Sequence, residues 1–504
     1  SIMGTVTAPA LSDQPLAVSQ GVFNLFEVYP ETPDTRHMKY NMVLTSVTGE
    51  SFYFSGYKVV KDGAVTDAWA DNSTLYVTVY KGDNKQGEVF GKAVMHIKPA
   101  DFIVQLSTIT VSNAANEAEK LKSVVRFGKF FAGVLWQSYA GILYNEPRFD
   151  PDAPPRKKRP LRAGLPDVHM FNTEDDVNLR LSRYQGGTKG PVMLVHGLGV
   201  ASSIFSTDTI HTNLVEYLYA NDYDVWLLDF RVSIDLPAAK EQCNGDQVAK
   251  YDFPAAIDVI KQQTGCQSVQ ALVHCYGATT FFMSMLAGLK DVRSIVCSQI
   301  ATNLVLPKST TIKTGIHLPG FLEKIGIDSM SAYTDTNEGF LGKLYDQAVE
   351  LNALAEAQGQ CENPVCHRVT FLYSSLYRHE TLNNKLHENL HELFGEANIT
   401  TLKHLSELCR KGTLVSADGE NIYMDHIDNL NLPILFISGE MNECYLPEST
   451  EITFNMLQQK FGKEQYSREV IPGYAHIDCI FGERAVDDVY PLMLAHLEKT
   501  AVSS

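Results

Sequence analysis

Hydrophobic and polar positions follow two different patterns along the chain. Before residue 110, apolar and β-branched residues alternate with polar ones in short runs, which is typical of strands with one face in water. Turn residues such as Lys61-Asp62-Gly63 separate these runs. The runs cover residues 42–45, 51–55, 73–80 and 94–97. The pattern predicts an all-β module, either a sandwich or a partial barrel, followed by a helical stretch from about residue 114 to 144.

The second half of the chain instead contains short runs rich in apolar residues that alternate with helical segments. Such runs are expected of strands buried in a sheet that helices cover on both faces. The runs are residues 192–195, 224–228, 269–273, 293–296 and 434–437. The helical segments lie near 253–264, 276–288, 448–460 and 483–498. This alternation predicts a doubly wound, mostly parallel α/β sheet.

The length of 504 residues agrees with more than one folded unit. The region 303–428 breaks the strand–helix alternation with mostly helical, polar sequence, which favours a lid inserted at the carboxyl ends of the strands. Four prolines in 151–160, next to the basic Arg156-Lys157-Lys158-Arg159, predict a solvated linker, with a targeting or docking patch as the alternative. The expected parts are a tail (1–20), a β-rich module with a trailing helix (21–145), a Pro-rich basic linker (146–164), an α/β core (165–302 and 429–504) and a helical lid insertion (303–428).

The composition is that of a globular protein, with 44% hydrophobic and 20% charged residues. The 42 Lys and Arg residues against 59 Asp and Glu residues give a net charge of −17, which argues against a nucleic-acid partner because such a surface repels phosphates. The longest apolar stretch, 130–144, is interrupted by Gln137 and Ser138 and is shorter than the ~20 residues that span a bilayer. We therefore expect no transmembrane segment.

The nine cysteines are odd in number and form no Cys-x-x-Cys pair, which favours reduced thiols in a cytosol-like compartment. The first residues lack the charged start and the apolar run of a signal peptide, so the expected location is cytoplasmic. Cys361, Cys366 and His367 form a local cluster without a second ligand pair, and we expect no metal site. No Gly-x-Gly-x-x-Gly fingerprint follows a strand, and we expect no cofactor.

A candidate nucleophile follows the buried run 269–273. The sequence His274-Cys275-Tyr276-Gly277 leads directly into an apolar helix, which is the context of a nucleophile elbow with Cys275 at its tip. A helix starting at Tyr276 would favour the thiolate of Cys275 and direct the Tyr276 N–H at a developing oxyanion. The alternative is a buried structural cysteine, because cysteine is among the most buried residue types.

Two other segments supply partners for Cys275. His196-Gly197-Leu198 follows the run 192–195, where the N–H of Leu198 is the expected second oxyanion donor. His476, in the loop before the last helix, is the expected general base. The order nucleophile, acid position and histidine is that of the α/β-hydrolases.

The acid position after the run 434–437 carries Asn442 instead of a carboxylate. An amide can orient a histidine beside a cysteine nucleophile, as in papain-like proteases. Glu443 and Glu440 are the alternatives, and the sequence does not choose among the three. Asp478, two residues after His476, is expected to be structural or to face the lid.

Several ordered motifs between about residues 165 and 500 resemble the acid-lipase-like α/β-hydrolases. They are Tyr223-Asp224-Val225-Trp226, the Leu-Asp-Phe-Arg of 228–231, the segment 251–258, the elbow, and the Ala-His-Ile-Asp of 475–478. The stretch 446–451 also resembles the hydrolase part that accompanies cholesterol-oxidase-like (GMC-type) flavin oxidoreductases. The resemblance implies a lipophilic ester, lactone or thioester as substrate and an association with a separate flavin oxidoreductase.

Two departures from the elbow motif keep three hypotheses open. Val273 stands where a small residue normally relieves close packing, and Cys275 replaces serine. The first hypothesis is acyl transfer through a Cys275–His476–Asn442 triad. The second is a cyclisation or rearrangement in the same pocket without a covalent intermediate, with His476 as acid or base. The third is a non-catalytic partner protein that uses the β-rich module as its interaction surface.

Overall fold

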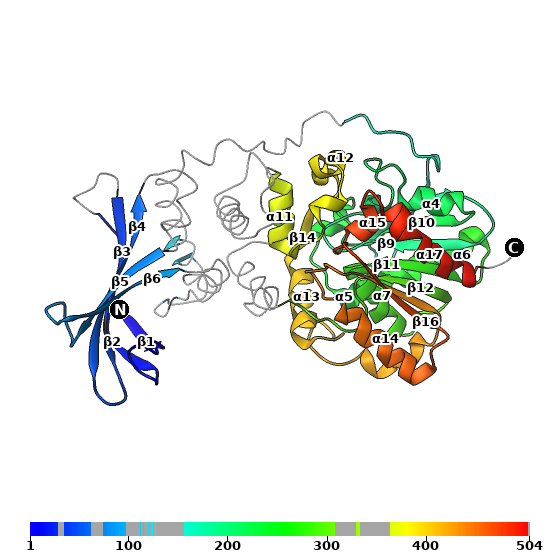
Figure 1. Cartoon of the computed structure of the whole chain (residues 1–504). Helices are drawn as coiled ribbons and strands as arrows, with labels where there is room; N and C mark the ends of the chain where they lie inside the picture. The colour runs from blue at the N-terminus through cyan, green and yellow to red at the C-terminus, as the bar shows by residue number, and fades with distance from the viewer. Residues whose placement is uncertain are drawn as a thin grey trace. The chain divides into compact units, whose positions relative to one another are not determined.

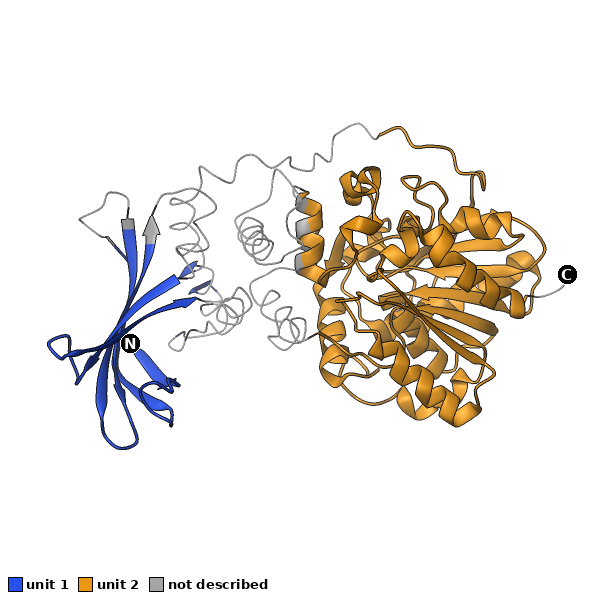
Figure 2. Ribbon diagram, viewed as in Figure 1, with its two compact units in different colours: residues 1–147 blue, residues 148–504 orange. Residues whose placement is uncertain are grey.

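The computed structural model describes residues 1–28, 35–61, 74–96, 156–307, 329–332 and 363–501, and seven single positions between 111 and 127. The chain divides into two compact units, residues 1–147 and 148–504 (Figure 2). Most of the helix expected at 114–144 and a large part of the expected lid insertion lie outside the described residues. No helix within the described ranges is both long and apolar enough to cross a membrane.

The first unit contains a six-stranded antiparallel sheet in which each strand pairs with its neighbour in sequence (Figure 1). Its strands are β1 (Ile2–Val6), β2 (Leu16–Val28), β3 (Thr35–Thr45), β4 (Ser51–Lys61), β5 (Thr74–Lys81) and β6 (Val89–His96). The described strands form one sheet and not the two layers of a sandwich, so the sandwich is wrong, and the alternative of a partial barrel stays a prediction. The tail expected at 1–20 is wrong, because Leu16 of β2 is buried with Met42, Leu44 and Phe52 and recruits this segment into the sheet.

The second unit has an eight-stranded sheet of order β16-β15-β12-β11-β9-β10-β8-β7 (Figure 1). Its strands are β7 (Asp167–Asn172), β8 (Asn178–Gln185), β9 (Pro191–Val195), β10 (Asp224–Asp229), β11 (Val269–His274), β12 (Val292–Ser298), β15 (Ile434–Gly439) and β16 (Tyr466–Ile471). All neighbours pair in parallel except β8 with β10 and β7 with β8. The predicted mostly parallel α/β sheet is therefore confirmed.

Helices cover both faces of this sheet (Figure 1). The main helices are α4 (Leu214–Ala220), α6 (Phe253–Thr264), α7 (Tyr276–Leu286), α14 (Glu448–Phe461) and α17 (Tyr490–Lys499). The predicted final helix over 483–498 is broken into α16 (Ala485–Asp488) and α17, and Pro491 lies in the first turn of α17. The rings of Phe253 and Phe281 meet edge to face at 5.1 Å, which joins α6 to α7.

The part of the expected lid insertion that the structure describes is mostly helical. It contains α11 (Pro364–Tyr373), η4 (His379–Thr381), α12 (Asn384–Glu388), η5 (Leu390–Glu392) and α13 (Ile399–Lys411). A short two-stranded sheet joins β13 (Ser329–Ser331) to β14 (Glu396–Asn398). Whether the whole insertion acts as a lid stays a prediction.

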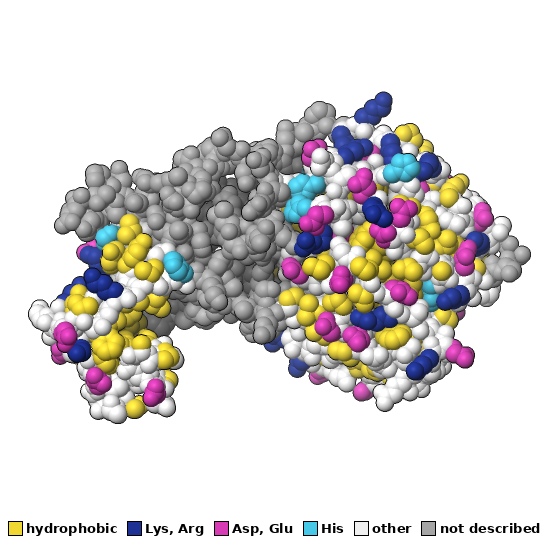
Figure 3. Space-filling model, in the orientation of Figure 1, with side chains coloured by type: hydrophobic (Ala, Val, Ile, Leu, Met, Phe, Trp, Pro, Cys, Tyr) yellow, Lys and Arg dark blue, Asp and Glu magenta, His cyan; other side chains and the backbone are white. Residues whose placement is uncertain are grey.

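The basic segment expected to be a solvated linker is bound to the second unit. Arg156 donates to both carboxylate oxygens of Asp208, at 2.8 and 2.5 Å. Arg159 donates to both carboxylate oxygens of Glu216, at 2.6 and 2.8 Å. Elsewhere on the visible face of this unit, acidic and basic side chains are interspersed (Figure 3). The expectation of a solvated segment is wrong because buried carboxylates of the second unit, those of Asp208 and Glu216, lie within reach of these guanidinium groups.

Candidate active site

Cys275 occupies the sharp turn between β11 and α7. Its backbone has φ 55° and ψ −130°, a strained combination for a residue with a side chain. The Cys275 N–H donates to the carbonyl oxygen of Ser298 at 3.1 Å. A Cβ on Gly277 would lie 2.1 Å from the carbonyl oxygen of His196, so only glycine permits this close crossing. The elbow expected from the sequence is therefore present, despite Val273 in its first position.

Two backbone donors face the sulfur of Cys275. The N–H groups of Tyr276 and Leu198 hydrogen-bond Sγ, and these are the two donors expected to form an oxyanion hole. Burial nevertheless raises the pKa of Cys275 to about 12, although both hydrogen bonds act to lower it. The expected preference for thiolate is thus wrong, because burial outweighs the two backbone hydrogen bonds, and Cys275 is a neutral thiol near pH 7.

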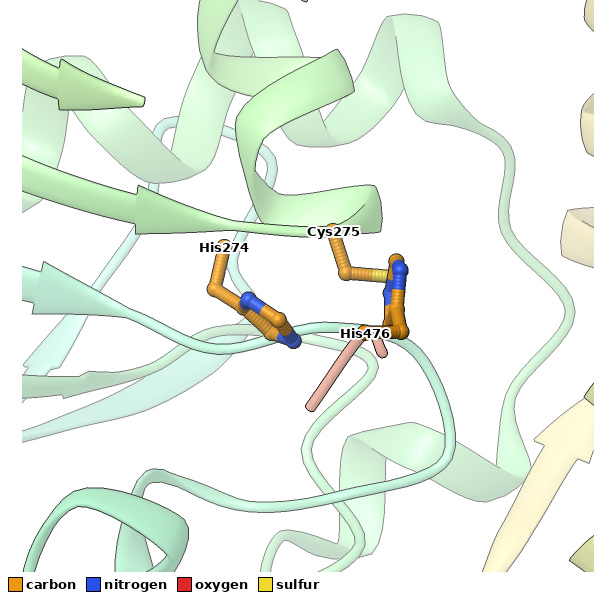
Figure 4. A group of neighbouring side chains, drawn as sticks. All are labelled: His274, Cys275 and His476. Carbon is orange, nitrogen blue, oxygen red and sulfur yellow. The ribbon is translucent and has the colours of Figure 1, made fainter. Parts of the chain in front are cut away.

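His476 lies in the loop between β16 and α15 (Asp478–Phe481), beside the elbow. Figure 4 shows the sulfur of Cys275 pointing toward the His476 ring, and His274 lies next to it. Sγ of Cys275 and one ring nitrogen from each histidine all lie within 4.8 Å of one another. Burial lowers the pKa of His476 to about 3, so the imidazole is neutral at pH 7.

Asn442 is the residue that the structure places against His476. Its Nδ2 lies 3.1 Å from His476 Nδ1. The alternatives Glu440 and Glu443 are both exposed, and Glu440 accepts a hydrogen bond from the Gly473 N–H at 3.2 Å. Of the three candidates for the acid position, the amide is therefore the one in contact with the histidine.

The other histidines singled out in the sequence line the surroundings of the site. His196 is fully buried, with Nδ1 2.7 Å from the carbonyl oxygen of Gly197 and its ring packed on Phe230. His274 has Nδ1 3.0 Å from Oγ of Ser298 and its ring 5.0 Å from that of His476. Burial lowers the pKa of both histidines, which makes them neutral neighbours of Cys275.

Asp478 ties the histidine loop to the described end of the insertion. Its carboxylate accepts hydrogen bonds from the N–H of Arg378 at 3.2 Å and from Oγ1 of Thr381 at 2.8 Å. The N–H of His476 donates to the carbonyl oxygen of Leu376 at 3.0 Å. Asp478 is therefore structural and contacts the insertion, as the sequence led us to expect.

Sequence reasoning missed two residues that support the site. Asp229, at the end of β10, accepts from the N–H and Oγ of Ser202 at 2.9 and 2.8 Å and so holds the loop that follows β9. Gln299, which directly follows β12, has φ 82° and accepts a hydrogen bond from Asn442 Nδ2 at 3.0 Å. Their positions in the sequence could have revealed both residues, because each lies at the carboxyl end of a predicted buried strand, where α/β folds place their sites.

A third missed residue is Tyr373, at the end of α11. Its hydroxyl is buried and has no hydrogen-bond partner among the described residues. A Cβ on Gly199 would lie 2.1 Å from this oxygen, so the hydroxyl packs against the backbone of the loop that carries Leu198. Burial, and to a smaller extent the nearby Cys275, raises the pKa of Tyr373, which keeps its proton available for donation.

A second histidine and cysteine cluster lies on the insertion. Cys366 Sγ is 3.4 Å from His379 Nε2, and one ligand atom from each of Cys366, His379 and His387 lies within 4.8 Å of the others. Cys361 and the His367 side chain, which completed the cluster considered from sequence, fall outside the described residues. Within the described residues the group has three potential ligands, one fewer than a structural zinc site uses.

Comparisons with known proteins agree with this geometry. No family model matches the chain. Lipase lipl-1 of Caenorhabditis elegans is 23% identical over 387 residues, which cover 68% of this chain and 92% of that protein. Human Lipase member K is 22% identical over 408 residues, which cover 74% of this chain and 98% of that protein. The chain is therefore similar to lipases over the larger part of its length.

One further relative matches only a part of the chain, and one solved structure shows a distant likeness. Human lysosomal acid lipase/cholesteryl ester hydrolase is 31% identical over 139 residues, but the match spans only 24% of this chain and 35% of that protein. The solved monoacylglycerol lipase of Paleococcus ferrophilus is 14% identical with a TM-score of 0.40, covering 64% of this chain and all of that one.

Proposed function

We propose that the hydrolase unit cleaves a lipophilic ester or thioester by acyl transfer through Cys275. The sulfur forms a bond to the carbonyl carbon, and the carbonyl oxygen moves toward the N–H groups of Leu198 and Tyr276. The thiol proton passes by way of His476 to the leaving oxygen or sulfur as its bond to carbon breaks. Water then hydrolyses the acyl thioester, which releases the acid and restores the thiol.

One observation carries this proposal: the strained elbow holds a sulfur that receives two backbone N–H groups beside a buried imidazole. A reactive atom held at such a turn and faced by two preorganised donors is the arrangement that acyl transfer requires. An ester substrate is further supported by the names of the relatives, which are lipases and a cholesteryl ester hydrolase. A lipophilic acyl group follows from the same likeness.

Intact-mass spectrometry with a p-nitrophenyl ester of a medium-chain fatty acid tests the proposal. We expect wild-type protein to release p-nitrophenol and to gain the mass of one acyl group, and Cys275→Ala to do neither. Cys266→Ala is the matched control, since Cys266 is also a free thiol but follows α6. Unchanged turnover in Cys275→Ala would overturn the assignment.

A second candidate function is a cyclisation or rearrangement without a covalent intermediate, with His476 as proton donor. It is favoured by the contact of His476 with an amide nitrogen of Asn442 instead of a carboxylate. This function predicts turnover that survives Cys275→Ala and is lost in His476→Ala. An association with a flavin oxidoreductase, a cytoplasmic location and a non-catalytic role of the β-rich unit stay predictions.

A further inference from the structure

The orientation of the Asn442 amide is fixed by backbone groups on both of its sides. Its Oδ1 accepts the N–H groups of Cys444 and Tyr445, both at 3.0 Å. Its Nδ2 faces Oε1 of Gln299 at 3.0 Å, and that oxygen already accepts the N–H of Gly439, also at 3.0 Å. A backbone N–H can only donate, so an oxygen must face it at each of these three contacts.

The opposite orientation would break this network. Turning the Asn442 amide would bring its NH₂ group against two backbone N–H groups and its oxygen against Oε1 of Gln299. Turning Gln299 as well would remove the acceptor of the Gly439 N–H. Asn442 and Gln299 are both almost fully buried, so water would not replace the lost partners. Nδ2 of Asn442 is therefore the atom that faces His476.

We infer that Asn442 holds His476 in the neutral tautomer with its proton on Nε2. Nδ2 of Asn442 donates to Nδ1 of His476, so Nδ1 must present its lone pair. A neutral imidazole has one N–H, which then lies on Nε2. His476 Nε2 is buried and has no hydrogen-bond partner among the described residues, which leaves this N–H directed into the site and available to a substrate oxygen.

The inference rests on the proposed function only for which atoms react, namely Sγ of Cys275 and the substrate carbonyl. It adds to that function the tautomer in which His476 rests. A histidine that takes the thiol proton needs a lone pair on Nε2, and hence its own proton on Nδ1. In serine proteases, replacing the triad aspartate with asparagine imposes the wrong tautomer and lowers kcat about 10⁴-fold. Asn442 is thus a positioning residue that makes resting His476 a donor, and thioester formation must await a change of tautomer.

The protonated imidazole is disfavoured in the same way. Its Nδ1–H would point at the NH₂ group of Asn442, and both groups are donors. The titratable groups around the His476 ring are Cys275 and His274 on one side and Tyr445 on the other. The ring centroids of Tyr445 and His476 are 5.8 Å apart. None of these three supplies a negative charge near pH 7, since burial raises the pKa of Cys275 and of Tyr445.

The direct test is the ¹⁵N spectrum of histidine-labelled, deuterated full-length protein at pH 7. His476 is assigned by comparison with His476→Gln. We expect a pyridine-like shift for Nδ1 and a pyrrole-like shift for Nε2. The reverse pattern, or the two averaged shifts of an imidazolium, would overturn the inference. The measurement uses wild-type protein and no substrate, so it stands whether or not an ester is cleaved.

Alkylation of Cys275 by iodoacetamide, followed by peptide mass spectrometry, supplies a second test. In Asn442→Asp the carboxylate accepts a hydrogen bond from Nδ1–H of His476, which leaves the lone pair of the imidazole on Nε2. Because this lone pair can take the proton of Cys275, we expect alkylation of Cys275 at pH 7 to be at least about 10-fold faster than in wild type. Asn429→Asp is the matched control, since Nδ2 of Asn429 donates to the Leu286 carbonyl oxygen outside the site. Equal rates in folded Asn442→Asp and wild type would contradict the inference.

Failure of this inference and failure of the proposed function give different results. If the tautomer is right but Cys275 is not the nucleophile, the ¹⁵N pattern holds and no acyl adduct forms. If acyl transfer is right but the tautomer is wrong, the adduct forms quickly and Asn442→Asp has no effect on alkylation.

Discussion

The hydroxyl of Tyr373 is a side-chain donor that lies against the loop that carries Leu198. It packs against Gly199 and has no partner among the described residues, so a substrate oxygen bound by the two backbone donors is its natural acceptor. We expect Tyr373→Phe to lower kcat for ester cleavage about 10-fold with little change in KM, because the donor acts most on developing charge. Steady-state kinetics with the p-nitrophenyl ester measure this.

Tyr217→Phe is the control for that substitution, because Tyr217 lies on α4 and packs against Tyr490. Its kcat should equal that of wild type. The role given to Tyr373 would be contradicted by a Tyr373→Phe enzyme with full kcat and an unchanged KM.

Burial of His476 should make stability depend on pH. Its folded pKa of about 3 is below the ordinary value of 6.5, so the unfolded chain binds more protons between these values. The free energy of unfolding is therefore highest above pH 6.5 and falls as the pH drops toward 3. We expect His476→Gln to reduce this slope by up to about 1.4 kcal/mol per pH unit between pH 6 and 4, measured by urea unfolding.

The exposed His211 provides the comparison for this experiment. His211→Gln should keep the wild-type slope. His196 and His274 are also buried with lowered pKa values, so part of the slope must survive in His476→Gln. Identical slopes in wild type and His476→Gln would mean that His476 is protonated in the folded state.

Part of the candidate site was predictable from sequence, but the supporting residues Asp229, Gln299 and Tyr373 and the protonation of the site were not. Cys275, His476, Leu198 and Tyr276 could be placed because each directly follows a buried strand or precedes a helix. The direction of the Asn442 amide depends on the N–H groups of Cys444, Tyr445 and Gly439, which only the folded backbone brings together. The pKa of Cys275 depends in the same way on burial, which outweighs the two backbone hydrogen bonds from Tyr276 and Leu198.

At the scale of elements, the ion pairs of the basic segment join it to α4. Burial alone would raise the pKa of Glu216, but hydrogen bonds from Arg159, from the N–H groups of Arg162 and Asn213, and from the Arg162 side chain bring it to about 2. We expect Arg159→Ala to lower the free energy of unfolding by about 1–3 kcal/mol at pH 7, because it leaves a buried carboxylate without the closer of its two guanidinium partners. Urea unfolding measures the loss.

Lys158→Ala is the matched control in the same segment. Lys158 is mostly exposed and lies 3.4 Å from Glu392, so its loss should cost less than about 0.5 kcal/mol. If both variants unfold like wild type, the segment is solvated, as its composition first indicated.

Elements with a strong hydrophobic pattern could be predicted, and amphipathic edge elements could not. The five central strands β9, β10, β11, β12 and β15 are short runs rich in apolar residues, and all five were expected from the sequence. Strand β16 reads Tyr-Ser-Arg-Glu-Val-Ile and lies at the sheet edge with its middle residues partly exposed, so it gives no such signal. The tail at 1–20 was missed because its strands alternate over too few residues.

At the scale of the whole molecule, every residue of the candidate site belongs to the second unit. The positions from His196 to His476 all lie within 148–504, and that unit has its own sheet and its own covering helices. We therefore expect a shortened chain of residues 148–504 to fold alone and to unfold in a single cooperative step. Its Cys275 should react with iodoacetamide at the rate measured in the full chain.

The same experiment separates the two roles open to the β-rich unit. If that unit only recruits a partner, its removal leaves both the alkylation rate and ester cleavage unchanged, because the elbow, Asn442 and Gln299 are held by contacts within 148–504. A folded shortened chain with normal alkylation but lost cleavage would show that the first unit takes part in substrate binding. Loss of cooperative unfolding would instead contradict the independence of the second unit, since its sheet and helices would then need residues 1–147 to stay packed.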